Sequence, residues 1–171
     1  MKSFICLSSA VSRICLGISL TLLAGCFGPS LPPFEKPIAR SEYQKVRTTA
    51  YTHTESDHRR YGKRNALGST LQYASVRSAA ADWSRWPAGT VFKILATGEL
   101  FKVDDYGWAL SGTNTIDLYK PSHAAMNAWG VRRVTIQVLH WGDVRYSYRV
   151  LNPRRKYRHV DRMLDQIEDR Y

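Results

Sequence analysis

Short segments rich in β-branched and aromatic residues dominate the middle of the chain, and they constrain the fold more than any other feature. They cover residues 45–52, 91–95, 100–103, 115–119 and 131–139. The second and third flank residues 96–99 (ATGE) and predict a β-hairpin. The last alternates apolar and polar residues, as a strand with one buried face does. Many short strands at close spacing predict a mainly β fold, a small barrel over residues 45–141.

Two helical segments are predicted beside the strands. Residues 121–129 (PSHAAMNAW) form a short helix that Gly130 ends. Residues 142–171 form a basic C-terminal tail, with a cationic cluster at 154–158 (RRKYR). After this cluster, one face of an amphipathic helix carries Val160, Met163, Leu164 and Ile167. This helix either docks on the barrel with its charged face in solvent, or contacts an anionic polymer of the cell envelope.

The N-terminus has the form of an export signal. Lys2 and Arg13 precede an apolar run that ends in residues 23–26 (LAGC), and this sequence resembles the bacterial lipobox. The resemblance implies a signal peptide over residues 1–25 and lipidation of Cys26. The alternative is an ordinary signal peptide or a short anchor helix, with Cys26 incidental. Phe27, which is not aspartate, favours the outer membrane with the protein facing the periplasm. Residues 26–44 contain four prolines and predict an extended tether.

Charge narrows the choice of partners. The 171 residues include 25 Lys plus Arg and 14 Asp plus Glu, a formal net charge of +11. Nucleic acid is the usual partner of a basic protein, but export argues against it, and we expect none. The polyanions of the envelope, peptidoglycan among them, are the alternative partners that a basic surface would concentrate. The excess charge could also serve solubility alone.

Several chemistries find no support in the sequence. The five histidines form neither HExxH nor another ligand-spaced pair, so no zinc site is expected. GxSxG, GxGxxG and P-loop motifs are missing. Cys6 and Cys15 lie in the predicted signal peptide, and Cys26 would carry lipid, which leaves no thiol for a disulfide or a metal. We therefore expect neither a metal nor a cofactor.

Three aspartates stand in unusual settings. Asp82 follows three alanines, Asp105 ends a strand at a glycine turn, and Asp117 lies between Ile116 and Leu118. A carboxyl group that faces a cleft beside other carboxyl groups has a raised pKa, which suits a general acid near neutral pH. Taken singly, each aspartate would more often be a turn cap or a surface charge.

Together with their flanking residues, these aspartates resemble the three-aspartate (3D) domain. This domain is the C-terminal module of membrane-bound lytic transglycosylase A and occurs in several Gram-positive cell-wall enzymes. Its motifs are matched in order by residues 49–52 (TAYT), 65–68 (NALG), 80–82 (AAD) with 87–90 (PAGT), 105–112 (DYGWALSG), 116–119 (IDLY) and 130–139 (GVRRVTIQVL). The resemblance covers residues 47–140.

Three departures from the family pattern concern the groove. Trp108 replaces the second glycine of the usual D-T-G-G, and Asn114-Thr115 replaces a common basic or polar pair. Residues 53–78 are rich in basic side chains where the family has small polar ones. All three acids are retained, so we expect a groove of altered shape around the same carboxyl groups.

The resemblance implies a six-stranded double-psi β-barrel and cleavage of the β-1,4 bond between N-acetylmuramic acid and N-acetylglucosamine. It implies that Asp117 is the acid/base, that Asp105 lies beside it, and that Asp82 completes the cluster. Gly107 and Gly112 would let the sugar approach the backbone. Tyr51, Trp83 and Trp108 are candidate substrate contacts, although core packing is the favoured alternative for Trp83. Two alternatives stay open: a non-catalytic, expansin-like barrel that binds peptidoglycan or loosens the wall, and a structural envelope lipoprotein.

Overall fold

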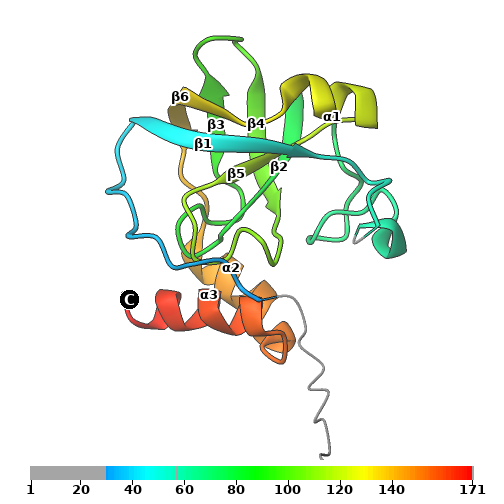
Figure 1. Ribbon diagram of the computed structural model, residues 1–171. Coiled ribbons are helices and arrows are strands. Elements are labelled where there is room, and N and C mark those ends of the chain that lie inside the picture. The colour runs from blue at the N-terminus through cyan, green and yellow to red at the C-terminus, as the bar shows by residue number, and fades with distance from the viewer. Residues whose placement is uncertain (1–29, 57, 171) are drawn as a thin grey trace, which may run out of the picture.

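Six strands close into a mixed β-barrel (Figure 1). The computed structural model describes residues 30–56 and 58–170, so the predictions for the signal peptide and for Cys26 lie outside the described residues. The strands are β1 (Tyr43–Tyr51), β2 (Val76–Ala81), β3 (Val91–Ile94), β4 (Leu100–Asp105), β5 (Ile116–Tyr119) and β6 (Arg132–His140). Their order around the barrel is β1-β5-β2-β4-β3-β6.

The barrel combines two parallel strand pairs with antiparallel ones. β1 runs parallel to β5 and β2 runs parallel to β4, whereas the other neighbours are antiparallel. Side chains alternate between the interior and the outer surface, as the pleat requires. In β5, for example, Ile116 and Leu118 are fully buried and Asp117 between them is partly exposed. The strands thus hold an apolar core and present polar groups outside.

The strand predictions can be compared with this barrel. The five predicted segments correspond to β1, β3, β4, β5 and β6, and the predicted hairpin is the antiparallel pair β3–β4. β2 had no strand signal of its own, because its sequence VRSAAA is poor in the residues that favour strands. Its small side chains nevertheless suit a position between β5 and β4, where Ala79 and Ala81 are completely buried.

The predicted short helix is α1 (His123–Trp129). The hydroxyl of Ser122 accepts a hydrogen bond from the Ala125 N–H and caps its first turn, and Gly130, at φ +61°, ends it. The helix lies against β1 at one end of the barrel (Figure 1).

The C-terminal residues form a helical layer at the opposite end of the barrel (Figure 1). It consists of α2 (Val144–Leu151), the 3₁₀ turn η2 (Asn152–Arg154) and α3 (Arg158–Glu168). The four apolar residues predicted to share one helix face are all buried in α3, in the same cluster as the barrel core. The apolar side chains of α3 therefore pack against the barrel core. No helix among the described residues is both long and apolar enough to span a membrane.

Part of the predicted tether is attached to the folded body. The Glu35 main-chain N–H donates to the Gly112 carbonyl at 2.8 Å, and its carboxylate accepts from the Asn114 N–H at 2.8 Å. From α3, Arg162 donates to the Pro32 carbonyl at 2.7 Å. Residues 32–38 thus form a strap over the loop between β4 and β5.

Candidate functional site

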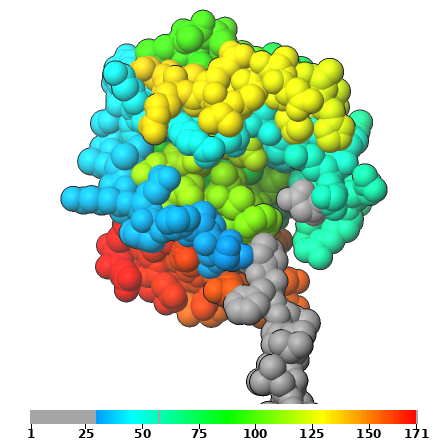
Figure 2. Space-filling model, viewed as in Figure 1, coloured from blue at the N-terminus to red at the C-terminus, as the bar shows by residue number. Residues whose placement is uncertain are grey.

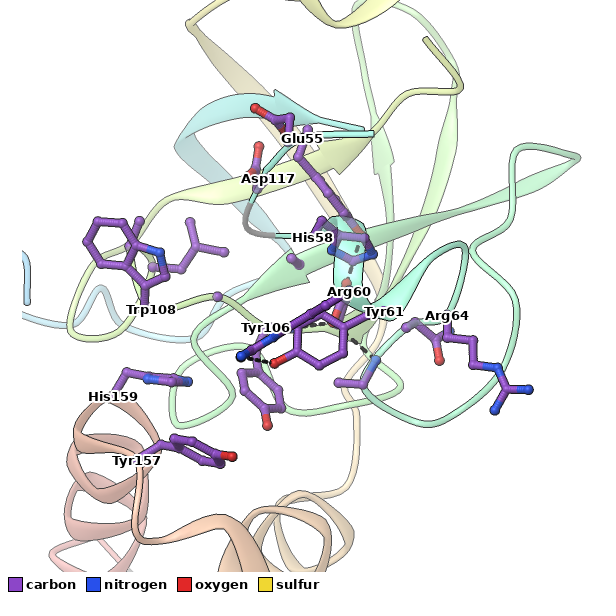
Figure 3. A pocket seen from close by; sticks show the side chains of 18 of the residues that line it. Glu55, His58, Arg60, Tyr61, Arg64, Tyr106, Trp108, Asp117, Tyr157 and His159 are labelled. Carbon is purple, nitrogen blue, oxygen red and sulfur yellow. Dashed lines mark hydrogen bonds between the residues drawn. The ribbon is translucent and has the colours of Figure 1, made fainter. Parts of the chain in front are cut away.

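A groove of about 1160 Å³ opens on the outer surface of the barrel. One side is the barrel wall, and a second is the lobe formed by residues 52–56 and 58–75, which stands in teal beside the hollowed face in Figure 2. Residues 153–159, here called the helical wall, close the third side (Figure 3). The charged and aromatic lining residues are Tyr51, Glu55, His58, Arg60, Tyr61, Arg64, Asp105, Tyr106, Trp108, Asp117, Arg154, Lys156, Tyr157 and His159.

Strand register brings Asp105 and Asp117 to the same level of the barrel wall. Ala80 of β2 is paired with Asp105 on one side and with Asp117 on the other. All three residues line the groove. Two strand spacings put the two aspartate Cα atoms about 10 Å apart. Ala80 itself is buried, with 5% of its surface exposed, in a cluster that includes Tyr51.

A β-bulge turns Asp105 toward the groove. Ala79 pairs with Val103 and Ala80 pairs with Asp105, so Asp104 is the extra residue. Without it, strict alternation would point Asp105 into the barrel. Asp104 is itself buried, and its carboxylate accepts from Ser78 Oγ at 2.8 Å and Asn65 Nδ2 at 2.9 Å. Sequence reasoning gave this residue no role, because a bulge has no reliable local signal.

Asp117 is the carboxyl group that a ligand can reach. Its side chain is partly exposed, and Oδ1 accepts a hydrogen bond from Thr49 Oγ1 at 2.7 Å. Thr49 lies directly opposite on β1, so the parallel pairing of β1 with β5 fixes this contact. In Figure 3 the Asp117 side chain stands on the barrel side of the groove, across from Tyr157 and His159.

Asp105 is held more deeply, with 6% of its surface exposed. Oδ1 accepts from the main-chain N–H groups of Ala66 at 3.1 Å and Tyr106 at 3.0 Å, and Oδ2 accepts from Tyr51 Oη at 3.1 Å. Burial raises the pKa of Asp105 to about 7, against the opposing effect of these donors, and nearby Asp104 adds to the rise. Burial, followed by the charge of Asp105, raises the pKa of Tyr51 as well. Asp105 therefore exchanges a proton near neutral pH.

We expect this titration to appear in the stability of the fold. The folded pKa of Asp105 lies above the unfolded value, so the folded state binds the extra proton between about pH 4 and pH 7. The contribution of Asp105 is therefore present below about pH 4 and is lost as the pH rises to about 7. Relative to Asp105→Asn, the wild type should lose up to about 4 kcal/mol of unfolding free energy over this range.

Urea unfolding of both proteins at successive pH values measures this difference. Asparagine keeps the size of the side chain and an oxygen for the two main-chain donors. Subtraction removes the contributions of other titrating groups, such as Asp82 and His159. A difference between the two proteins that does not change with pH would contradict the raised pKa.

Asp82 does not join the other two aspartates. It is completely buried and does not line the groove. Its Oδ1 accepts from the Ser84 N–H at 2.8 Å and Ser84 Oγ at 2.6 Å, and its Oδ2 accepts from the Gly112 N–H at 2.6 Å. Asp82 thus fastens the loop between β4 and β5, whose residues 107–110 do line the groove. Of the three aspartates predicted to cluster, Asp105 and Asp117 line one groove and Asp82 is a buried anchor outside it.

The other predicted contacts divide in a similar way. Tyr51, Gly107 and Trp108 line the groove, and Trp108 is 38% exposed. Trp83 is fully buried, so it presents no face to a sugar; its indole N–H donates to the Asp105 carbonyl at 2.8 Å. Gly112 is buried outside the groove, with φ +80°. This left-handed backbone conformation strains any other residue, which accounts for glycine without a ligand.

Sequence reasoning missed the helical wall. Arg154, Lys156 and Tyr157 belong to the basic cluster of the tail and His159 follows it, and neither interpretation of the tail included the groove. The sequence analysis did identify residues 53–78 as rich in basic side chains. Two of them, Arg60 and Arg64, line the groove. Over residues 30–56 and 58–170, no three His, Cys, Asp or Glu side chains converge to hold a metal ion.

Comparison with known proteins does not assign the protein to a family. No protein-family model matches the sequence, and no curated protein matches it either. The functional argument therefore rests on the groove and on the motifs within the chain.

Proposed function

We propose that the protein is a peptidoglycan lytic transglycosylase that cleaves the bond between N-acetylmuramic acid and N-acetylglucosamine. The observation that carries the proposal is the pair Asp105 and Asp117, which flank Ala80 in a groove large enough for several sugar rings. Asp117 is open to a ligand, and Asp105 exchanges its proton near pH 7. A proton donor facing a cleft is what glycosidic cleavage requires.

In the proposed reaction Asp117 acts twice. Its carboxylic acid gives a proton to the glycosidic oxygen as the bond from that oxygen to the muramyl C1 breaks. The resulting carboxylate then takes the proton of the muramyl 6-hydroxyl while that oxygen bonds to C1. A 1,6-anhydro end forms, the carboxylic acid is restored, and no water is consumed. One carboxyl group suffices, unlike the two-carboxylate pattern of hydrolases.

Asp105 is a positioning residue in this proposal. Its three hydrogen bonds join the end of β1, the lobe and the Tyr106 turn around one carboxyl group. Below its pKa of about 7 it is neutral, which lets an acidic glycan approach. Asp82 does not contact the glycan in this proposal. It holds the loop that carries Gly107 and Trp108, which line the groove.

The proposal includes the finer fold assignment, a double-psi barrel of the 3D family. Its support is the pair of parallel pairings, β1–β5 and β2–β4, within an otherwise antiparallel closed barrel. The motifs of the resemblance also fall at related places. Tyr51 and Asp105 end strands, Asp82 follows the end of a third, and Asp117 lies within β5 beside them.

The place of action follows from the same proposal. The protein is exported, is lipidated at Cys26 and is held at the outer membrane facing the periplasm. Residues 23–26 (LAGC) and the preceding apolar run support this. The glycan strands of peptidoglycan would then lie within reach of the groove.

A second candidate is a binding module without catalysis, an expansin-like barrel. The observation that favours it is the exposure of aromatic side chains in the groove. Trp108 is 38% exposed and Tyr157 is 45% exposed, and both could stack on sugar faces whether or not a bond is cleaved.

Product analysis decides between the two. Full-length protein in detergent is incubated with purified peptidoglycan, and the soluble products are read by mass spectrometry. We expect muropeptides with 1,6-anhydro ends. Reducing ends would indicate hydrolysis by water. Protein that sediments with the peptidoglycan and releases no product from it would favour the binding module.

A further inference from the structure

The helical wall faces the proposed acid across the groove, although it lies outside the segment that resembles the 3D domain. Pro153, Arg154, Lys156, Tyr157 and His159 all line the groove. Figure 3 shows Tyr157 and His159 at the helical side, opposite Asp117 and Trp108. A ligand that lies against Asp117 and spans the groove therefore meets this wall.

The wall is fixed rigidly to the site. Both terminal nitrogens of Arg154 donate to the Ala66 carbonyl at 3.0 Å, and Nη1 also donates to Tyr106 Oη at 3.2 Å. The N–H of the same Ala66 donates to Asp105. One residue of the lobe therefore joins the helical wall to a groove carboxyl group, and the distance across the groove is set before any ligand binds.

Aromatic rings form a continuous surface along the wall. The Tyr157 and His159 rings are stacked, with centroids 6.0 Å apart and planes at 28°. Tyr106 continues the row, 5.9 Å from His159. Burial lowers the pKa of His159, so at neutral pH this ring contributes a face and not a charge. Such a surface suits the face of a sugar ring.

Three cations at the groove have no acidic partner among the described residues. Arg60, Arg64 and Lys156 are exposed, and none of them takes part in an ion pair over residues 30–56 and 58–170. Lys156 Nζ lies 5.3 Å from the Tyr157 ring centroid, above the aromatic surface. Arg154 is different, because its guanidinium is occupied by Ala66 and Tyr106.

We infer that the helical wall and the lobe form a subsite for a carboxylate carried on the glycan, read by Lys156 and by Arg60, whose guanidinium lies beside Tyr61 within the groove (Figure 3). The inference rests on the proposed function, since it assigns the recognised substituent of that substrate. Muramyl residues carry their carboxylates on a lactyl branch or on the peptide attached to it, beside the sugar ring and away from the cleaved bond. Cations collected in a concave site attract such a group and orient the strand.

Binding to an inactive protein tests the subsite apart from cleavage. Full-length Asp117→Asn protein in detergent is titrated by calorimetry with a soluble two-repeat peptidoglycan fragment. The same fragment is used in three further forms: with its carboxylates converted to amides, with the peptides removed to leave lactyl carboxylates, and as a neutral chitin tetrasaccharide. We expect the acidic fragment to bind about tenfold more tightly than its amidated form.

Charge removal supplies the matched comparison. In the same background, Lys156→Gln with Arg60→Gln should remove this tenfold preference and leave binding of the neutral tetrasaccharide unchanged. Lys93 is an exposed lysine of β3 that does not line the groove. Lys93→Gln should therefore change neither the preference for the acidic fragment nor the binding of the neutral tetrasaccharide. If the fragment without peptides also binds more tightly than the amidated form, the lactyl carboxylate is the recognised group. If only the fragment with peptides does so, the recognised group is a carboxylate of the peptide.

Equal binding of acidic and amidated fragments, or an equal loss in the Lys93 variant, would overturn the subsite. So would the failure of all four ligands to bind. Acid-dependent binding by a protein that releases no product from peptidoglycan would leave the subsite standing and refute the proposed cleavage. Release of anhydro products with no effect of the two substitutions would refute the subsite alone.

Discussion

Asp117→Asn lowers the release of anhydro products by about 10³-fold if Asp117 is the acid/base. Asparagine can neither give a proton to the glycosidic oxygen nor take one from the 6-hydroxyl. Its side-chain oxygen can still accept the hydrogen bond from Thr49 Oγ1, which is 2.7 Å from the carboxylate oxygen. The fold and the affinity for glycan should therefore be retained, and the loss should lie in the rate of product release measured by mass spectrometry.

Glu55→Gln is the matched control. Glu55 is another carboxylate of the groove, but it belongs to the lobe and accepts a hydrogen bond from the Thr52 N–H at 3.0 Å. Glutamine can keep this bond, so we expect activity within a few-fold of the wild type. An inactive Glu55 variant beside an active Asp117 variant would transfer the role of the acid to the lobe.

The second large effect is on stability and concerns Asp82. Asp82→Ala should lower the free energy of unfolding by about 3–5 kcal/mol. The substitution leaves the buried N–H groups of Ser84 and Gly112 without an acceptor. It also leaves Arg85, whose Nε lies 3.9 Å from Asp82 Oδ2, in a buried site without its carboxylate. Urea unfolding followed by circular dichroism measures the change.

Asp143→Ala calibrates this result. Asp143 caps α2 by accepting from the Arg145 and Tyr146 N–H groups, and it is exposed. Removal of an exposed cap should cost about 1 kcal/mol. If Asp82→Ala were as stable as the wild type and lost only activity, Asp82 would be acting on the substrate, as its place in the motif first suggested.

The resemblance and the structure divide the three aspartates differently, and the reason is physical. The resemblance implies that Asp117 is the acid/base and that Asp105 and Asp82 lie in one cluster with it, because each follows or interrupts apolar residues. Burial separates them. Asp82 has no exposed surface and Asp105 has 6%, whereas Asp117 is partly open. Local sequence shows that a carboxyl group is unusual, but it does not show which neighbours fill the space around it.

Local pattern alone determined a good part of this protein. β-Branched and aromatic content predicted five of the six strands, Gly130 predicted the end of the short helix, and the spacing of Val160, Met163, Leu164 and Ile167 predicted the face that α3 buries. These features depend on residues within one or two turns of each other, so the sequence carries them directly.

Tertiary structure decided what makes the groove. The bulge at Asp104, the pairing of Ala80 with both Asp105 and Asp117, and the arrival of the helical wall all depend on which distant segments meet. Register and barrel closure are settled by the burial of the whole core, and a shift of one residue would turn a carboxyl group from the groove into the interior. The amino acids therefore determined which acids are present, and only the closed barrel decided which of them face a ligand.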